Sequence, residues 1–188
     1  TTGASNAAVG FQALKANTTA SNSTAVGYNS LAANTTGTQN VAVGAGALDA
    51  NTTANSGTAV GNNALSANTT GAENVAVGES ALELNTTGGT NVAVGREALA
   101  ANTTASNNTG LGYRALTSNT TGTINTALGR QALYSNTTGT DNTAISYALV
   151  TNSTGSNNVA VGKSALNANT TADNNTAVGT SALASNTT

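Results

Sequence analysis

The residue types that most often carry out chemistry in proteins are scarce in this sequence. It contains no Cys and no His, which excludes a thiolate or imidazole metal site, a disulfide and a Ser-His nucleophilic pair. Its carboxylates do not recur at one spacing, so they predict neither a catalytic acid pair nor a calcium-binding series. These carboxylates are Asp49, Glu73, Glu79, Glu83, Glu97, Asp141 and Asp173. We therefore expect no enzyme activity, no metal and no cofactor, and we interpret the acidic residues as solubilising charges.

Charge and hydropathy argue against two further kinds of partner. The formal net charge is −2 and there are only five Lys and Arg residues, which leaves no basic stripe for nucleic acid or an anionic membrane. No apolar run approaches the roughly 20 residues that a membrane helix needs, and the chain does not open with a signal peptide. The fragment Gly110-Leu111-Gly112 does not open a helix, so it does not predict a dinucleotide site. We expect no nucleic acid and no direct membrane contact in this segment.

The tripeptide Asn-Thr-Thr recurs along the chain and admits three interpretations. It is formally an N-glycosylation acceptor, but the repeat itself explains its many copies. Rows of Thr can order ice, yet adjacent threonines on an extended backbone point to opposite sides, which halves the array. We favour the third interpretation, in which each Asn amide donates to one neighbouring repeat and accepts from the other, so that the amides form a ladder. The predicted ladder consists of Asn17, Asn34, Asn51, Asn68, Asn85, Asn102, Asn119, Asn136, Asn152 and Asn169.

The whole chain is one unit written repeatedly. Counted from Asn68 as position 1, the unit reads N-T-T-(G/A)-x-x-N-(T/V)-A-V-G-x-x-A-L-x-(A/S), and the next unit begins 17 residues later at Asn85. One unit is a residue shorter, because Ser146 stands where the others have Gly and only Tyr147 separates it from Ala148. A one-residue loss is tolerated in a turn but would exchange the two faces of a strand, so positions 12 and 13 are predicted to be a turn. Both ends of the sequence fall within a unit, and we expect an excerpt from a longer fibre.

This strict periodicity predicts a stacked fold. One Phe, four Tyr and no Trp are too few for an ordinary globular core, and 6% charged residues are atypical of disorder. Positions 7 to 11, as in 40–44, show the period-2 alternation of a strand, and positions 14 to 17 predict a second short strand. Asn, Thr and Gly recur too often for helices. We predict one all-β domain over residues 1–188, a parallel β-solenoid (β-roll or β-helix) of about eleven coils spaced about 4.8 Å apart.

Comparison of the units with one another separates inward from outward positions. Position 15 is always Leu and position 10 is always Val, Leu or Ile, whereas charged and aromatic residues occur only at positions 5, 6, 12, 13 and 16. The predicted core consists of Leu14, Leu31, Leu48, Leu65, Leu82, Leu99, Leu116, Leu133, Leu149, Leu166, Leu183, Val26, Val43, Val60, Val77 and Val94.

Position 9 suggests a partner for the chain. It is Ala in every unit except at Gly110, and it lies on the strand face opposite to positions 8 and 10. Small residues on a second face favour the close approach of an identical chain, so we predict a homo-oligomer that packs through Ala25, Ala42, Ala59, Ala76 and Ala93. The alternative is a three-sided coil in a single chain, with positions 4, 10 and 15 inward.

The segment Asn-Val-Ala-Val-Gly-x-x-Ala-Leu, found at 91–99 and 158–166, resembles the head repeat of trimeric autotransporter adhesins of the YadA type. The full unit with Asn-Thr-Thr-Gly is also similar to repeats of bacterial surface fibres and phage tail fibres. The resemblance covers all the units and implies left-handed β-rolls, three chains around one axis, and an extracellular or cell-surface location. The unit departs from the head repeat in its added Asn-Thr-Thr corner and in Leu at position 15.

Together these observations predict a structural, non-enzymatic segment of an extracellular fibre. It would form the stalk or head of a surface adhesin or filament that mediates or projects attachment to a host, prey or other cell surface. The alternatives are a phage tail-fibre segment, an ice-binding solenoid, and a glycan-binding solenoid that uses Tyr28, Tyr113 and Tyr147.

Overall fold

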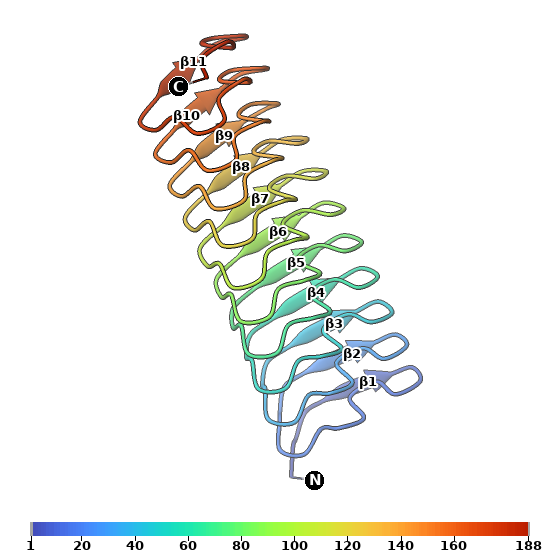
Figure 1. The fold of residues 1–188 in the computed structure, drawn as a ribbon. Helices are drawn as coiled ribbons and strands as arrows, with labels where there is room; N and C mark the ends of the chain where they lie inside the picture. The colour runs from blue at the N-terminus through green and yellow to red at the C-terminus, as the bar shows by residue number, and fades with distance from the viewer. Residues whose placement is uncertain (1, 188) are drawn as a thin grey trace.

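The computed structural model describes residues 2–187 and consists of a single stack of coils (Figure 1). Each coil contributes one three-residue strand, and the eleven strands form one parallel sheet in sequence order. The strands are β1 (Ala7–Val9), β2 (Thr24–Val26), β3 (Val41–Val43), β4 (Thr58–Val60), β5 (Val75–Val77), β6 (Val92–Val94), β7 (Thr109–Leu111), β8 (Thr126–Leu128), β9 (Thr143–Ile145), β10 (Val159–Val161) and β11 (Thr176–Val178). The predicted all-β parallel solenoid is therefore confirmed.

The strands pair in a constant register. In β4 and β5, Ala59 lies opposite Ala76, one unit further along the chain. The short unit keeps this register, since β9 and β10 pair Ala144 with Ala160. Its missing residue falls in the bend that follows β9, which confirms that positions 12 and 13 form a turn.

The interior of the rod is built from Leu and Ala within a single chain. The side chains of Leu31 through Leu166 at position 15 are fully buried, and Leu14 is 9% exposed. Leu183 was also expected in the core but is half exposed, because no further coil covers it within residues 2–187. The strand alanines at position 9 complete the interior and are fully buried from Ala25 to Ala160, apart from Gly110 in their row.

The predicted orientation of the strands is wrong: Val at position 10 was expected in the core and Ala at position 9 on the outer face, and the structure shows the reverse. Val26, Val43, Val60 and Val94 point outward with 36% to 38% of their surface exposed, and Val77 on the same face is half-buried. The reason is width: a Cβ built at Gly110 would lie 3.3 Å from a backbone oxygen and 3.4 Å from Leu99, so the interior accepts Ala and nothing larger.

This reversal also removes the predicted self-association face. The alanines proposed to pack against another chain, at positions 25, 42, 59, 76 and 93, have no exposed surface in one chain. The alternative three-sided coil is correct for two of its three inward positions, because Leu at position 15 and the small residue at position 4 lie inside. The third inward position is Ala at position 9 and not Val at position 10.

Positions 14 to 17 form a turn, so the predicted second strand is wrong. The leucines at position 15 have left-handed backbones, with φ of 52° at Leu48 and 56° at Leu65, which no strand accommodates. This conformation costs about 1–2 kcal/mol per residue. Burial of a Leu side chain contributes about 1.5–3 kcal/mol, which is enough to offset it. The backbone still bonds between coils, since the Leu48 N–H donates to the Ala64 carbonyl at 3.1 Å.

Each strand ends at a glycine that the stacking requires. At Gly78 the φ angle is +134°, outside the range of residues with a side chain, and a Cβ there would lie 2.7 Å from the carbonyl atoms of Gly95 in the next coil. Ser146 is the exception in this column, with a φ of 77°. The short coil permits that change because its following turn contains one residue fewer.

Candidate functional site

The predicted Asn ladder is present along the interior of the rod. The Nδ2 group of Asn85 donates to Asn68 Oδ1 at 2.9 Å and to the Gly88 carbonyl at 2.9 Å, and its Oδ1 accepts from Asn102 Nδ2 at 2.7 Å. The members from Asn34 to Asn169 are fully buried, whereas Asn17 is half-buried. Each amide therefore stabilises its own corner and both neighbouring coils.

A second amide ladder runs beside the first, at position 7. Asn74 Nδ2 donates to the Gly88 carbonyl at 2.7 Å, and its Oδ1 accepts the backbone N–H of Asn91 at 2.9 Å. The two ladders share an acceptor, because the Gly88 oxygen also receives the bond from Asn85. The frequent Asn at position 7 was the sequence signal for this second ladder, and Ser23 and Gly57 interrupt it.

The structure bears on two other interpretations of Asn-Thr-Thr. A buried Asn that uses both amide hydrogens offers no accessible site for a glycan in the folded chain. The two threonines also differ: the Thr86 hydroxyl donates to the Thr103 carbonyl at 3.0 Å, whereas Thr87 is exposed. Each such corner presents one free threonine, which is half of what a paired ice-binding array contains.

We expect replacement of Asn85 with Ala to destabilise the rod strongly. The change leaves Asn68 Oδ1, Asn102 Nδ2 and the Gly88 oxygen each without one buried partner, at about 1–3 kcal/mol per unsatisfied group. Thr87→Ala is the matched control, because it changes the same corner on its exposed side. The measurement is the midpoint of thermal or urea unfolding. Equal and negligible shifts for the two variants would show that the ladder contributes nothing to stability.

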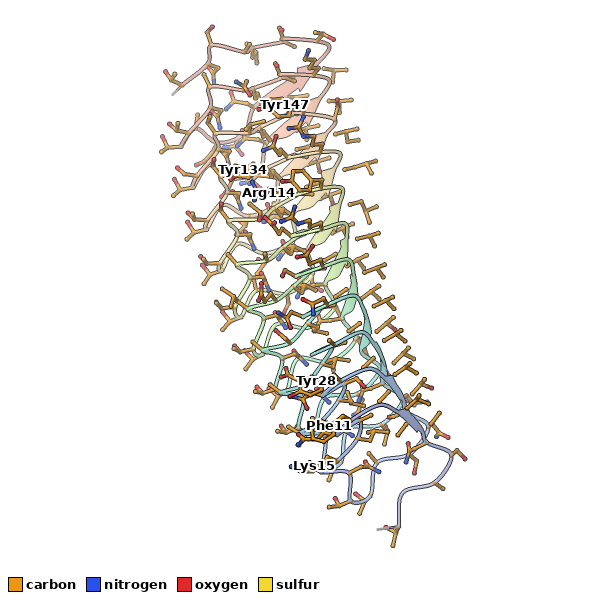
Figure 2. All side chains as sticks on the ribbon, turned by 90° about the vertical axis from the view of Figure 1, so that its right-hand side faces the viewer. Phe11, Lys15, Tyr28, Arg114, Tyr134 and Tyr147 are labelled. Carbon is orange, nitrogen blue, oxygen red and sulfur yellow. The ribbon has the colours of Figure 1, made fainter. Side chains whose placement is uncertain are left out.

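Outside the rod, the turn after each strand forms a continuous surface that we call the loop ridge. It consists of the residues at positions 12 and 13, which include Phe11, Tyr28, Glu79, Arg96, Glu97, Tyr113, Arg114, Arg130, Gln131, Tyr147 and Lys163. These residues follow one another along the rod, as the labelled Phe11, Tyr28, Arg114 and Tyr147 illustrate (Figure 2). The loop ridge concentrates aromatic and charged side chains that the interior lacks.

The chemistry of the loop ridge changes along the rod. Near the N-terminus, the rings of Phe11 and Tyr28 stack with centroids 5.5 Å apart. In the middle, Arg96 pairs with Glu97 at 2.8 Å, and Glu97 also accepts from Arg114 at 2.5 Å. The Arg114 hydrogen bond is the main reason that the pKa of Glu97 lies below its usual range. The stacked rings and the Glu97–Arg114 pair join neighbouring coils, whereas Arg96 and Glu97 are adjacent residues of one coil. Ion pairs at a protein surface contribute little to stability.

The three tyrosines proposed for glycan binding do not meet in one site. Tyr28 stacks on Phe11, and Tyr113 lies beside Arg114, whose guanidinium is 5.2 Å from the ring centroid. Tyr147 lies in the short coil and lines a cavity of about 410 Å³. The cavity is shared by three successive coils, a juxtaposition that follows from the repeat register. Of the three tyrosines, only Tyr147 lines this cavity.

The acidic residues also stay apart. Within residues 2–187 no three Asp or Glu side chains converge as a metal site would require. Asp49 is half-buried, and its burial raises the pKa of its carboxyl group. The described part of the chain contains no helix long and apolar enough to cross a membrane.

These features define the class of the molecule: it is a β-solenoid repeat protein with two internal amide ladders and a variable external ridge. No protein-family model matches the chain, and the curated proteins and solved structures compared with it gave no match either. The likeness to the YadA-type head repeat therefore rests on the sequence motif.

Proposed function

We propose that this chain is a structural, non-enzymatic segment of an extracellular fibre. It acts as a stiff spacer, in the stalk or head of a surface adhesin or filament, that holds an attachment site away from its base. The observation that carries this proposal is the repetition of one set of bonds from coil to coil. Length along the axis is the property that such repetition controls directly.

The spacing argument is additive. The Asn ladder, the strand pairing and the Leu turn each join one coil to its immediate neighbours. An added coil therefore extends the rod by about 4.8 Å and leaves existing contacts unchanged. From β1 to β11 the rod spans about 50 Å on this basis.

The proposal includes self-association within the fibre, now through the outer face of the sheet. This face carries a row of exposed position-10 side chains, among them Val26, Val43, Val60 and Val94, flanked by Thr or Val at position 8. A continuous apolar strip of this length is the kind of surface that a second copy of the chain covers. Three chains around one axis is the arrangement that the resemblance implies.

Removal of whole and partial units tests the spacer. Deletion of residues 68–84 removes one period, and we expect a folded rod that is shorter by one coil. Deletion of 68–74 removes a corner without the rest of its coil, and we expect loss of cooperative unfolding because register and ladders no longer match. Unfolding curves and small-angle scattering measure both results. Equal tolerance of the two deletions would contradict the additive stacking.

Attachment of the intact fibre to its natural surface tests the role. We expect attachment to vary with the number of coils, because a spacer acts through its length. Attachment should be insensitive to Tyr28→Asn, Arg96→Asn and Tyr113→Asn. The fold should accept Asn at these sites, since Asn62 occupies the same position in another coil. Loss of attachment in these variants, at unchanged rod length and melting temperature, would show that the loop ridge itself adheres and would refute the spacer.

A further inference from the structure

The short unit between Ile145 and Ala148 opens a notch in the loop ridge. In the other coils the residue at position 13 donates its N–H to the position-12 carbonyl of the preceding coil, as Gln131 does to Tyr113 at 2.9 Å. The short coil has no residue at position 13. Within residues 2–187 no N–H donates to the Arg130 carbonyl oxygen, which should receive that bond.

A second backbone group loses its partner at the same place. In the other coils the position-14 N–H closes the turn onto the position-11 carbonyl, as Ala132 does to Gly129 at 3.3 Å. Ala148, which follows Tyr147 directly, has no such bond within the described residues although it is fully buried. The shortened turn therefore leaves an unused backbone acceptor at Arg130, which lines the notch, and an unused backbone donor at the buried Ala148. Protein backbones rarely leave such groups without a partner.

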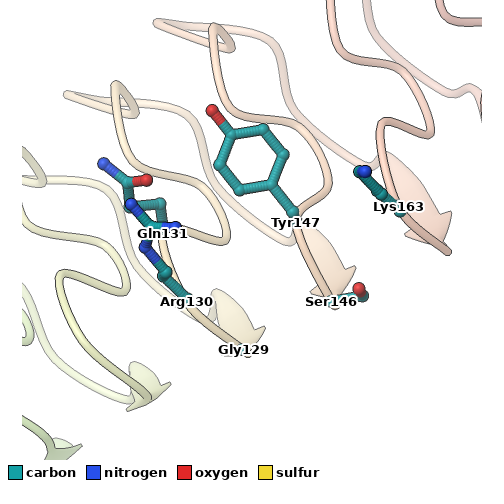
Figure 3. A pocket seen from close by; sticks show the side chains of 6 residues that line it. All are labelled: Gly129, Arg130, Gln131, Ser146, Tyr147 and Lys163. Atoms are coloured by element: carbon teal, nitrogen blue, oxygen red, sulfur yellow. The ribbon is translucent and has the colours of Figure 1, made fainter.

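The side chains around the notch come from three coils. Gly129, Arg130 and Gln131 line it from the preceding coil, Ser146 and Tyr147 from the short coil, and Lys163 from the following coil. Figure 3 shows Tyr147 standing between Arg130 and Gln131 on one side and Lys163 on the other. The cavity of about 410 Å³ falls within the range of small-ligand sites.

The notch is positively charged, in a protein whose formal net charge is −2. Arg130 and Lys163 are exposed, and no salt bridge joins either of them to an acid within residues 2–187. The loop ridge contains no acidic residue after Glu97, whose carboxylate is already paired with Arg114. Two free cations on either side of a tyrosine ring therefore face a shared cavity.

We propose that this notch binds an acidic saccharide, a sugar that bears a carboxylate or sulfate group. Arg130 and Lys163 would hold the anionic group, the Tyr147 ring would provide a flat apolar face for the sugar ring, and the free Arg130 carbonyl would accept a sugar hydroxyl. A simple anion would leave the ring and the carbonyl unused, and a neutral sugar would leave the cations unused. The inference does not depend on the spacer role, since a rod can carry one lateral site.

Titration of the intact chain, followed by NMR or calorimetry, tests the proposal with four probes. These are a uronate-containing disaccharide, a sulfated disaccharide, the neutral disaccharide of the same linkage, and sodium sulfate. We expect one acidic disaccharide to bind at one site, with about tenfold or greater preference over the neutral sugar. The two acidic arms distinguish a carboxylate from a sulfate ligand. Equal binding of all the sugars, tighter binding of sulfate alone, or no binding of either acidic sugar would overturn the proposal.

Variants that copy other coils separate the notch from the fold. Insertion of Asn between Tyr147 and Ala148, combined with Ser146→Gly, recreates the Gly27-Tyr28-Asn29 turn and should close the notch and abolish binding. Tyr147→Ala should weaken binding, because it removes the ring that faces the sugar. The fold should tolerate the change, since Ala45 occupies position 12 in another coil.

Two further variants test the cations. Arg130→Asn combined with Lys163→Thr should remove the preference for the acidic sugar. The fold should tolerate both changes, because Asn62 and Thr180 occupy position 12 in other coils. Lys15→Ala is the control, since it removes a cation outside the loop ridge and should leave binding unchanged. Unchanged binding after the Asn insertion, or tighter binding of a polyglutamate peptide than of either sugar, would refute the saccharide site.

Discussion

Gly78→Ala is expected to lower the free energy of unfolding by about 3–5 kcal/mol, because it combines backbone strain with a steric clash. At a φ of +134° a residue with a side chain has a strained backbone, however much space surrounds it. Here the space is absent as well, since the new Cβ would lie 2.7 Å from backbone atoms of Gly95 in the next coil. Backbone cannot rotate away as a flexible side chain can. Urea unfolding of the variant measures the loss.

Gly46→Ala is the matched control for this prediction. Gly46 also has a positive φ, but its value of 67° lies in the left-handed region that Asn29 and Asn63 occupy at the same position. The atom nearest to the new Cβ is the side-chain oxygen of Asn63 at 2.6 Å, which can turn aside. We expect a loss of only about 1 kcal/mol. Equal losses for the two variants would mean that close stacking of the glycine column does not limit the fold.

Ala59→Glu should be at least as damaging, because it would bury a carboxylate without a partner inside a single chain. Ala59 has no exposed surface and lies on the narrow inner face of β4. An uncompensated buried charge costs about 3–5 kcal/mol, and the larger side chain adds overpacking. We expect the variant to lose cooperative unfolding at room temperature. This effect requires no second chain.

Val60→Glu, one residue further along the same strand, separates folding from assembly. Val60 points outward and is 37% exposed, so a single rod should tolerate Glu there with a loss below about 1 kcal/mol. If identical chains pack through the outer face, the same change should reduce the mass measured by light scattering to that of one chain. A multi-chain mass that survives Val60→Glu would place the interface elsewhere. A one-chain mass for the unmodified protein would refute self-association.

The period of the sequence was enough to predict the solenoid, because a unit of 17 residues with one invariant Leu has few ways to bury it. The same reasoning misplaced Val43 and Ala42, since hydrophobicity alone assigns the larger side chain to the core. The missing information was the width of the coil, which Leu48 and its neighbours already fill. The sequence did hold a hint: position 9 is confined to Ala or Gly, whereas position 10 varies among Val, Leu and Ile.

Backbone conformation at the corners could not be predicted from residue types. Leu48 adopts a left-handed φ of 52°, a conformation that Leu ordinarily avoids. Only the stacked neighbours, which bury the side chain and bond the backbone, make it favourable. For the same reason the four-residue segment that contains Leu48 resembled a strand in sequence and is a turn in the structure.

The notch illustrates the converse case, in which the sequence contained the signal. The missing residue beside Tyr147 was visible as a break in the period. Arg130 and Lys163 occupy the same position in the adjacent units, so the register places all three side by side. What the sequence lacked was the pair of backbone groups that the shortened turn leaves free, because these follow from the bonding pattern of the complete coils.

The direction of the bonds between coils has a mechanical consequence. Strand pairing and the Asn ladders both run along the rod axis, so tension applied to the two ends loads the coils in series. Coils should then yield one after another, and each would release about 50 Å of extended chain. A tether built in this way dissipates a sudden pull in many small steps, and it recovers its length as coils stack again onto the intact remainder.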